Sequence, residues 1–139
     1  MAEELPTALD QLVTELEDRG FTVVAEQRDD AHFGNRLVEL ADPSRQTASA
    51  IRLVRDRGLW SVEVEIAGKW RDPYKVLLAL DGSNYPTRAS SNDERLQFTL
   101  AVVNRLPKTL PELQPVIDRL EEFDREYWRR LGVQDPDGT

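Results

Sequence analysis

A stripe of apolar residues at three- and four-residue spacing opens the chain: Leu5, Leu9, Leu12, Val13 and Leu16. This spacing places all of them on one side of a helix and predicts a helix over residues 7–19. Thr7 can cap its start, and Gly20 can end it in the left-handed conformation. The opening segment is therefore expected to pack as a helix on a core.

Four strands are predicted in the middle of the chain, over residues 21–27, 34–41, 50–55 and 59–66. In the first, Phe21, Val23 and Ala25 are expected on one face and Val24 on the other. The fourth has the clearest alternation, with Trp60, Val62, Val64 and Ile66 on one face against Ser61, Glu63 and Glu65. Strict period two indicates one buried and one solvated face. Short connections, such as the tight turn at Gly58, predict an antiparallel meander.

The last half of the chain returns to helical patterns. Asp72 and Pro73 are a typical cap and first residue of a helix over residues 73–80. A polar stretch over residues 83–91 predicts a loop, and Asn92 or Asp93 can cap a helix that continues to about residue 106. Because of Pro115, the final helix is expected to begin near residue 114 and to continue to about residue 131. Its predicted stripe is Val116, Ile117, Leu120, Phe123, Tyr127 and Leu131.

The predicted fold is a single α+β domain over residues 1–139, with a frayed tail at about residues 133–139. It has an N-terminal helix, a four-stranded antiparallel meander and three C-terminal helices packed on one sheet face. We expect Trp60, Val62, Val64 and Ile66 to be buried against two helical stripes: Leu9, Leu12, Leu16 and Leu96, Leu100, Val103.

Composition places the chain among ordinary folded domains. Apolar residues make up 40% of its 139 residues and charged residues 32%, which is sufficient for a hydrophobic core. Cysteine is absent from the sequence, which excludes disulfides and thiolate metal sites. The first residues lack the basic and apolar regions of a signal peptide, and no apolar run is long enough to span a bilayer. We therefore expect the protein in the cytoplasm.

The net charge of −8 narrows the range of partners. A strongly acidic chain is poorly suited to phosphate backbones and to anionic membrane surfaces, so neither nucleic acid nor a membrane is the expected partner. The same charge favours, more weakly, a basic protein.

The sequence offers little catalytic chemistry. Its single histidine, His32, follows Asp29 and Asp30 in a polar connection with no orienting partner and no metal-binding motif. Glu63 and Glu65 share one strand face about 7 Å apart, a spacing that resembles an acid/base pair. Cross-strand pairing with Arg52 or Arg36 explains the same two carboxylates without any reaction. We predict no catalytic, cofactor-binding or metal-binding residues.

Aromatic residues beside arginine suggest a binding surface instead. Trp70 and Arg71 precede the helix at Asp72 in a predicted loop, where a tryptophan either anchors an interface or caps the edge of the core. Trp128 adjoins Tyr127 on the last helix and either widens its stripe or is exposed. The candidate partner-binding residues are Trp70, Arg71, Glu63, Glu65 and Trp128.

The central stretch carries a resemblance. Residues 33–40, beginning Phe33-Gly34-Asn35, then residues 51–60, ending at Trp60, and then Trp70 with Asp72-Pro73 resemble small uncharacterised actinobacterial proteins. Some of these are similar to immunity proteins of polymorphic toxin systems. The resemblance covers residues 33–81, carries over no active site, and implies a protein partner.

Three hypotheses follow. The first is a non-catalytic binding protein, an immunity-type inhibitor that binds and occludes a basic toxin or enzyme. The second is an enzyme that uses carboxylates, either Glu63 with Glu65 or Asp29 with Asp30. The third is a homo-oligomeric structural or regulatory domain that associates through its open sheet face or its last helix.

Overall fold

The computed structural model describes residues 5–29, 34–81 and 91–132. In these ranges the chain forms helices and strands in this order: α1 (Thr7–Asp18), β1 (Thr22–Asp29), β2 (Asn35–Ala41), β3 (Ala50–Asp56), β4 (Leu59–Ile66), β5 (Lys69–Arg71), α2 (Pro73–Asp81), α3 (Asn92–Arg105) and α4 (Leu110–Arg130). The predicted α+β class is confirmed. The expected loop over residues 83–91 and the frayed tail fall outside the described residues, apart from Ser91.

The sheet is an antiparallel meander of five strands in the order β1-β2-β3-β4-β5, so the prediction of four strands was wrong by one. The additional strand, Lys69–Arg71, pairs with the end of β4. A two-residue turn joins them, in which Ala67 and Gly68 have φ values of 51° and 81°. These angles match a tight hairpin turn with the twist of the flanking strands.

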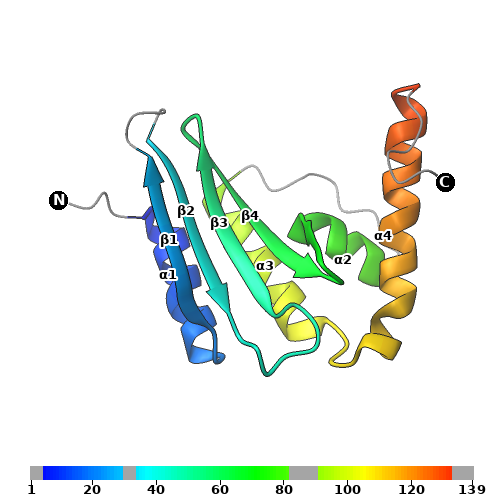
Figure 1. The fold of residues 1–139 in the computed structure, drawn as a ribbon, viewed down its shortest axis with the longest axis horizontal. Coiled ribbons are helices and arrows are strands. Elements are labelled where there is room, and N and C mark those ends of the chain that lie inside the picture. Colours follow the sequence, from blue (N-terminus) through cyan, green and yellow to red (C-terminus); the bar gives the residue numbers. More distant parts are fainter. Residues whose placement is uncertain (1–4, 30–33, 82–90, 133–139) are drawn as a thin grey trace.

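The helices lie on one side of the sheet, and Figure 1 shows α1 and α3 side by side behind it. None of the described helices lies on the other face. α2 lies beside the β5 end of the sheet, and α4 packs against α2 rather than across the sheet. The prediction that three C-terminal helices pack on one sheet face was therefore wrong, because α4 extends the molecule beyond the sheet edge.

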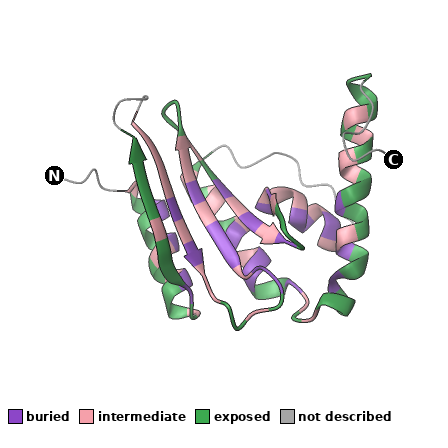
Figure 2. Ribbon diagram, viewed as in Figure 1, coloured by how far each residue is buried: buried purple, intermediate pink, exposed green. Residues whose placement is uncertain are grey.

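The core follows the predicted alternation of β4. Val62, Val64 and Ile66 are at most 4% exposed, and the α1 residues Leu9, Leu12 and Leu16 are fully buried. Figure 2 shows the resulting alternation of buried and partly exposed positions along β2, β3 and β4. Two expected core residues, Trp60 and Leu100, are only half-buried and pack against the margin of the cluster. Trp60 lies near the start of β4, where Arg55 rather than an apolar residue is its neighbour on β3.

β1 departs from its predicted alternation. Phe21 is buried, but it precedes the strand, and Val23 and Val24 are 40% and 54% exposed. The register with β2 shifts between Val23 and Ala25, which marks a β-bulge. A bulge adds one residue and exchanges the two faces, so a strictly alternating pattern fails at this edge strand.

α2 begins as predicted, with Pro73 first and the Asp72 carboxylate accepting a hydrogen bond from the Tyr74 amide at 3.0 Å, but α1 and α3 differ from their predicted caps. α1 begins after Pro6 with no side-chain cap, so Thr7 does not have the predicted role. α3 is capped by Ser91, whose hydroxyl accepts a hydrogen bond from the Glu94 amide while the Glu94 carboxylate accepts one from the Ser91 amide. This reciprocal capping box satisfies two amides that the helix leaves unpaired.

α4 begins at Leu110, four residues before its predicted start. The hydroxyl of Thr109 caps it, and Pro115 lies inside the helix, within its first two turns. Proline lacks an amide hydrogen, and its cost is smallest close to a helix start. The added turn buries Leu113, which the sequence analysis had not assigned to the core.

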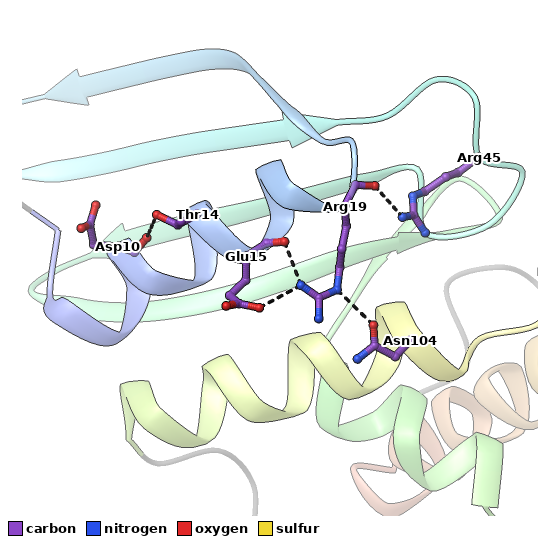
Figure 3. A network of polar contacts seen from close by, with 6 residues as sticks. All are labelled: Asp10, Thr14, Glu15, Arg19, Arg45 and Asn104. Carbon is purple, nitrogen blue, oxygen red and sulfur yellow. Dashed lines mark hydrogen bonds and ion pairs between the residues drawn. The ribbon is translucent and has the colours of Figure 1, made fainter.

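Polar contacts join the end of α1 to its neighbours (Figure 3). The Arg19 guanidinium donates to the carboxylate of Glu15 at 2.9 Å and to the side chain of Asn104 in α3 at 3.1 Å. Arg45, from the β2–β3 connection, donates to the carbonyl of Arg19 at 2.9 Å. Gly20 follows with φ of 100°, the predicted left-handed end of the helix. These contacts hold α1, α3 and the loop in one position.

Candidate protein-binding face

One side of the sheet is covered by none of the described helices, and we call it the open face. Its side chains come from alternate positions of β2 to β5 and point away from α1 and α3: Leu37, Glu39, Arg52, Val54, Glu63, Glu65 and Trp70. All seven are half-buried, because neighbouring side chains cover part of each one. Three are apolar, three are acidic and one is basic.

Arg52 organises the centre of the open face. It lies directly opposite Glu39 on β2 and Glu63 on β4. Its Nε donates to Glu63 Oε1 at 2.8 Å, and its guanidinium carbon lies 4.3 Å from the centre of the Trp70 ring. The ion pair and the cation–π contact hold one guanidinium from two sides. The Trp70 ring is thereby fixed in place on the surface before any partner binds.

The predicted cross-strand pairing of Glu63 with Arg52 is confirmed. The alternative partner, Arg36, instead contacts Glu26 on β1 at 3.7 Å. Glu65 lies opposite Trp70 in the register, and its carboxylate makes no hydrogen bond or ion pair in the part of the chain that the structure describes. The two carboxylates therefore share a face, as expected, but only one of them is used in an ion pair.

The structure brings together three of the five predicted partner-binding residues. Glu63, Glu65 and Trp70 lie on the open face, where Trp70 belongs to a strand and not to the predicted loop. Arg71 points to the opposite side, because adjacent residues of a strand face opposite ways. Trp128 lies on α4, where its ring meets that of Tyr127 edge-on at 5.4 Å.

Arg71 is largely buried and forms an ion pair with Asp124 of α4. Its side chain is 10% exposed, and its Nη1 lies 2.6 Å from Asp124 Oδ2 in α4. The Nε of the same guanidinium is buried without a hydrogen-bond partner. This ion pair links β5 to α4, so the predicted binding role of Arg71 does not fit its position.

A hollow of about 530 Å³ adjoins the centre of the open face toward the β1–β2 end of the sheet. Leu37, Val54, Arg52 and Glu63 contribute to its lining. The open face is therefore not flat. The Trp70 ring lies on one part of it, and a hollow lined by apolar and charged side chains lies beside that part.

The second half of α4 exposes apolar side chains that were expected to continue its buried stripe. Tyr127 and Leu131 are each 53% exposed, and Phe123 is half-buried. Lys75 of α2 lies 5.7 Å from the Tyr127 ring centre. The helix extends past α2, so among the described residues no helix covers the end of its periodic stripe. Periodicity alone could not show this, because it does not record where the neighbouring helix ends.

The described residues provide few features of a reaction centre. Within them no group of three or more His, Cys, Asp or Glu side chains is placed to hold a metal ion. The pKa of Asp42 is lowered, first by the hydrogen bond from the Ser44 hydroxyl, but Asp42 lies in the β2–β3 connection. Asp29 is exposed at the end of β1, and Asp30 and His32 are outside the described ranges. No described helix combines the length and apolar character needed to cross a membrane.

Arg52 was recognised in the sequence as a pairing partner for Glu63 but not as a contact of Trp70. The signal that could have placed it there is the fourth strand pairing, between β4 and β5. With residues 69–71 assigned as a strand, Trp70 falls beside the row of Arg52 and Glu63.

Comparisons with known proteins found no matching family model, no matching curated protein and no matching solved structure.

Proposed function

We propose that this protein is a non-catalytic binding domain that engages a protein partner through its open face. The observation that carries the proposal is the contact between Arg52 and Trp70 on an uncovered sheet. Tryptophan and arginine are the residues that most often dominate binding energy at protein interfaces. A ring that is already held by Arg52 and Glu63 loses little conformational entropy on binding.

The charge of the open face indicates the kind of partner. Glu39, Glu63 and Glu65 outnumber Arg52 on it, and the whole chain carries a net charge of −8. Acidic side chains around an aromatic anchor favour a basic partner, mainly by raising the association rate. An immunity-type inhibitor that occludes the active site of a basic toxin or enzyme fits this pattern, and the resemblance of residues 33–81 points the same way.

The carboxylate enzyme has no specific observation in its favour. Glu63 is engaged by Arg52, and Glu65 faces a tryptophan instead of a second acid or a metal site. The proposal therefore gives these two residues a binding role: Glu63 positions Arg52, and Glu65 contributes negative charge beside Trp70.

Self-association has one observation in its favour, the exposed apolar stripe of α4. Tyr127 and Leu131 are exposed apolar residues at the end of this helix, which no other described helix covers. Sedimentation of the purified protein over a range of concentrations tests this second function. A dimer that Tyr127→Asp disrupts supports it, and a monomer at high concentration removes it.

Site-specific photocross-linking in the native host tests the first proposal. A photoreactive residue at Glu65, beside Trp70, is expected to capture one discrete protein, and the same residue at Glu122 on α4 serves as the control. Capture at position 65 that disappears on adding Trp70→Ala supports the open face. No adduct at position 65, or equal adducts at both positions, contradicts it.

A further inference from the structure

β4 has a free edge beside its first residues. β5 pairs only with the last three residues of β4, in the register Val64 with Arg71, Glu65 with Trp70 and Ile66 with Lys69. β4 begins five residues earlier, at Leu59. Over that stretch the strand pairs with β3 on one side, and no described strand lies on the other side.

The two tight hairpins determine which backbone groups face this edge. The residues that flank a two-residue hairpin turn form a hydrogen-bonded pair, and such pairs recur at every second residue. Asp56 with Leu59 is one flanking pair, so β3 bonds to residues 59, 61 and 63. The N–H and C=O groups of Trp60 and Val62 therefore point to the free side. Neither residue has a backbone hydrogen bond outside the ladder in the described ranges.

A hollow of about 470 Å³ lies along this edge. Trp60 and Val62 line it from β4, Pro73 from the start of α2 and Phe98 from α3. Pro73 has no amide hydrogen to offer, so on that side the wall is apolar. Unpaired backbone donors and acceptors thus border a space with apolar walls.

Charged residues at the hollow are mainly acidic. Asp56 and Asp72 line it, and the Asp72 carboxylate also accepts a hydrogen bond from the Tyr74 amide at 3.0 Å. The one cation in the described lining, Arg95, donates to the side chain of Asn92 at 2.9 Å. A ligand with a positive charge near its apolar group complements this lining.

We infer that the free edge of β4 binds an extended peptide segment of a partner by strand addition. The segment pairs its backbone with Trp60 and Val62, places one apolar side chain in the hollow, and carries a basic residue toward Asp56. Strand addition uses main-chain hydrogen bonds for affinity and pockets for alternate side chains for specificity. The site is separate from the open face, because it uses the edge of β4 rather than a sheet surface, and it stands without the proposed function.

Amide hydrogen exchange tests the free edge itself. In the protein alone, the amides of Trp60 and Val62 are expected to exchange about a hundredfold faster than those of Ser61 and Glu63, which β3 protects. Equal protection of all four amides would show that the edge is already paired and would overturn the inference. Protection of Trp60 and Val62 that rises with protein concentration would also overturn it, because the occupant would then be a second copy of the chain.

Disulfide trapping tests the ligand, and the chain has no natural cysteine to interfere. The probe is the amidated peptide Cys-Thr-Leu-Lys-Val-Thr, supplied as its disulfide with 2-mercaptoethanol and equilibrated with Leu59→Cys in excess 2-mercaptoethanol. The thiolate introduced at position 59 attacks the peptide sulfur, and 2-mercaptoethanol leaves as the thiol. The matched control is Val24→Cys, on the other edge strand, which is also exposed and adjoins no such lining. We expect about tenfold more mixed disulfide at position 59, corresponding to about 1.4 kcal/mol, and new protection of the Trp60 and Val62 amides.

The same peptide with an N-methyl group on every residue after the cysteine distinguishes strand addition from simple apolar contact. It keeps all side chains but lacks the backbone donors of a strand. Loss of the excess trapping at position 59 supports the inference. Equal trapping with and without N-methylation, or equal trapping at positions 59 and 24, overturns it. Failure of the open-face cross-link leaves this result unchanged, so the two proposals fail separately.

Discussion

Arg71 in β5 and Asp124 in α4, 53 residues apart in the chain, form an ion pair with 2.6 Å between Nη1 and Oδ2. The Arg71 side chain is 10% exposed and Asp124 is 32% exposed. The pair fixes α4 to the last strand, on the side of the sheet opposite Trp70. The short strand thus has two roles, since Arg71 anchors a helix and the preceding residue, Trp70, belongs to the open face.

Removal of Asp124 is expected to destabilise the fold substantially. Asp124→Ala leaves the buried guanidinium of Arg71 without its counter-charge, which should lower the free energy of unfolding by about 3 kcal/mol. The matched control is Glu126→Ala, whose pairs with Arg129 and Arg130 are exposed and should cost less than about 0.5 kcal/mol. Urea denaturation measures both, and equal effects would show that the Arg71 pair contributes nothing beyond a surface contact.

Polar substitutions on the two faces of β4 should differ greatly in how much they lower the stability of the protein. Val64 is fully buried, so Val64→Asp places an unpaired charge in the core and should cost several kcal/mol, close to the stability of a small domain. Glu63→Gln should change stability by only about 0.5 kcal/mol, because Glu63 and Arg52 are each partly exposed. Thermal unfolding compares them. A stable Val64→Asp beside an unfolded Glu63→Gln would invert the assignment of faces.

The start of α3 offers a comparison between neighbouring residues. Ser91→Ala removes the capping box and should destabilise the protein by about 1 kcal/mol. Asn92→Ala removes only a hydrogen bond from Arg95 and should cost less. Chemical denaturation distinguishes them, and a larger loss for Asn92→Ala would assign the cap to Asn92.

The ionised carboxylate of Asp42 should make the folding stability of the protein depend on pH in the acidic range. Hydrogen bonds from Ser44, with the nearby Arg45, hold the pKa of Asp42 below its usual value. The ionised carboxylate thus stabilises the folded state at neutral pH, and this contribution is lost as the pH falls below about 4, through the lowered pKa. Asp42→Asn should therefore melt below the wild type at pH 7, with the gap closing toward pH 2.

Ser44→Ala is the matching control for Asp42. It removes the hydroxyl that donates to the carboxylate at 2.6 Å while keeping the acid itself. At pH 7 this variant should also melt below the wild type, and the difference between the two melting temperatures should again become smaller toward pH 2. A gap that stays constant between pH 7 and pH 2 for both variants would mean that the Asp42 contacts do not depend on ionisation.

Strand alternation and helical apolar stripes correctly predicted the elements in which one such pattern continues without interruption. The alternation of β4 predicted its bounds and three of its four expected buried residues correctly, and the stripe of Leu9, Leu12 and Leu16 predicted α1. β5 was missed because three residues are too few to show alternation, and the Ala67-Gly68 turn lacks the Asn-Gly or Asp-Gly signal of a tight hairpin. The bulge in β1 was missed because an added residue leaves no mark in composition.

The open face could be predicted only in part. Glu63, Glu65 and Arg52 followed from strand alternation and cross-strand pairing. The contact between Arg52 and Trp70 could not be predicted without β5. The burial of Arg71 could not be predicted without its partner Asp124, which lies on a helix far along the chain. Long-range pairs of this kind depend on how α4 packs on α2, which no local pattern encodes.

The central claim, that Trp70 anchors a protein partner on the open face, is tested most directly by one affinity measurement. The partner captured by cross-linking at position 65 is titrated against wild type, Trp70→Ala and Tyr127→Ala, all first shown to be folded by their melting temperatures. Trp70→Ala should weaken binding by 2 kcal/mol or more, about thirtyfold, whereas the equally aromatic Tyr127→Ala should change it by less than about twofold. Unchanged affinity for Trp70→Ala, or an equal loss for Tyr127→Ala, would contradict the account.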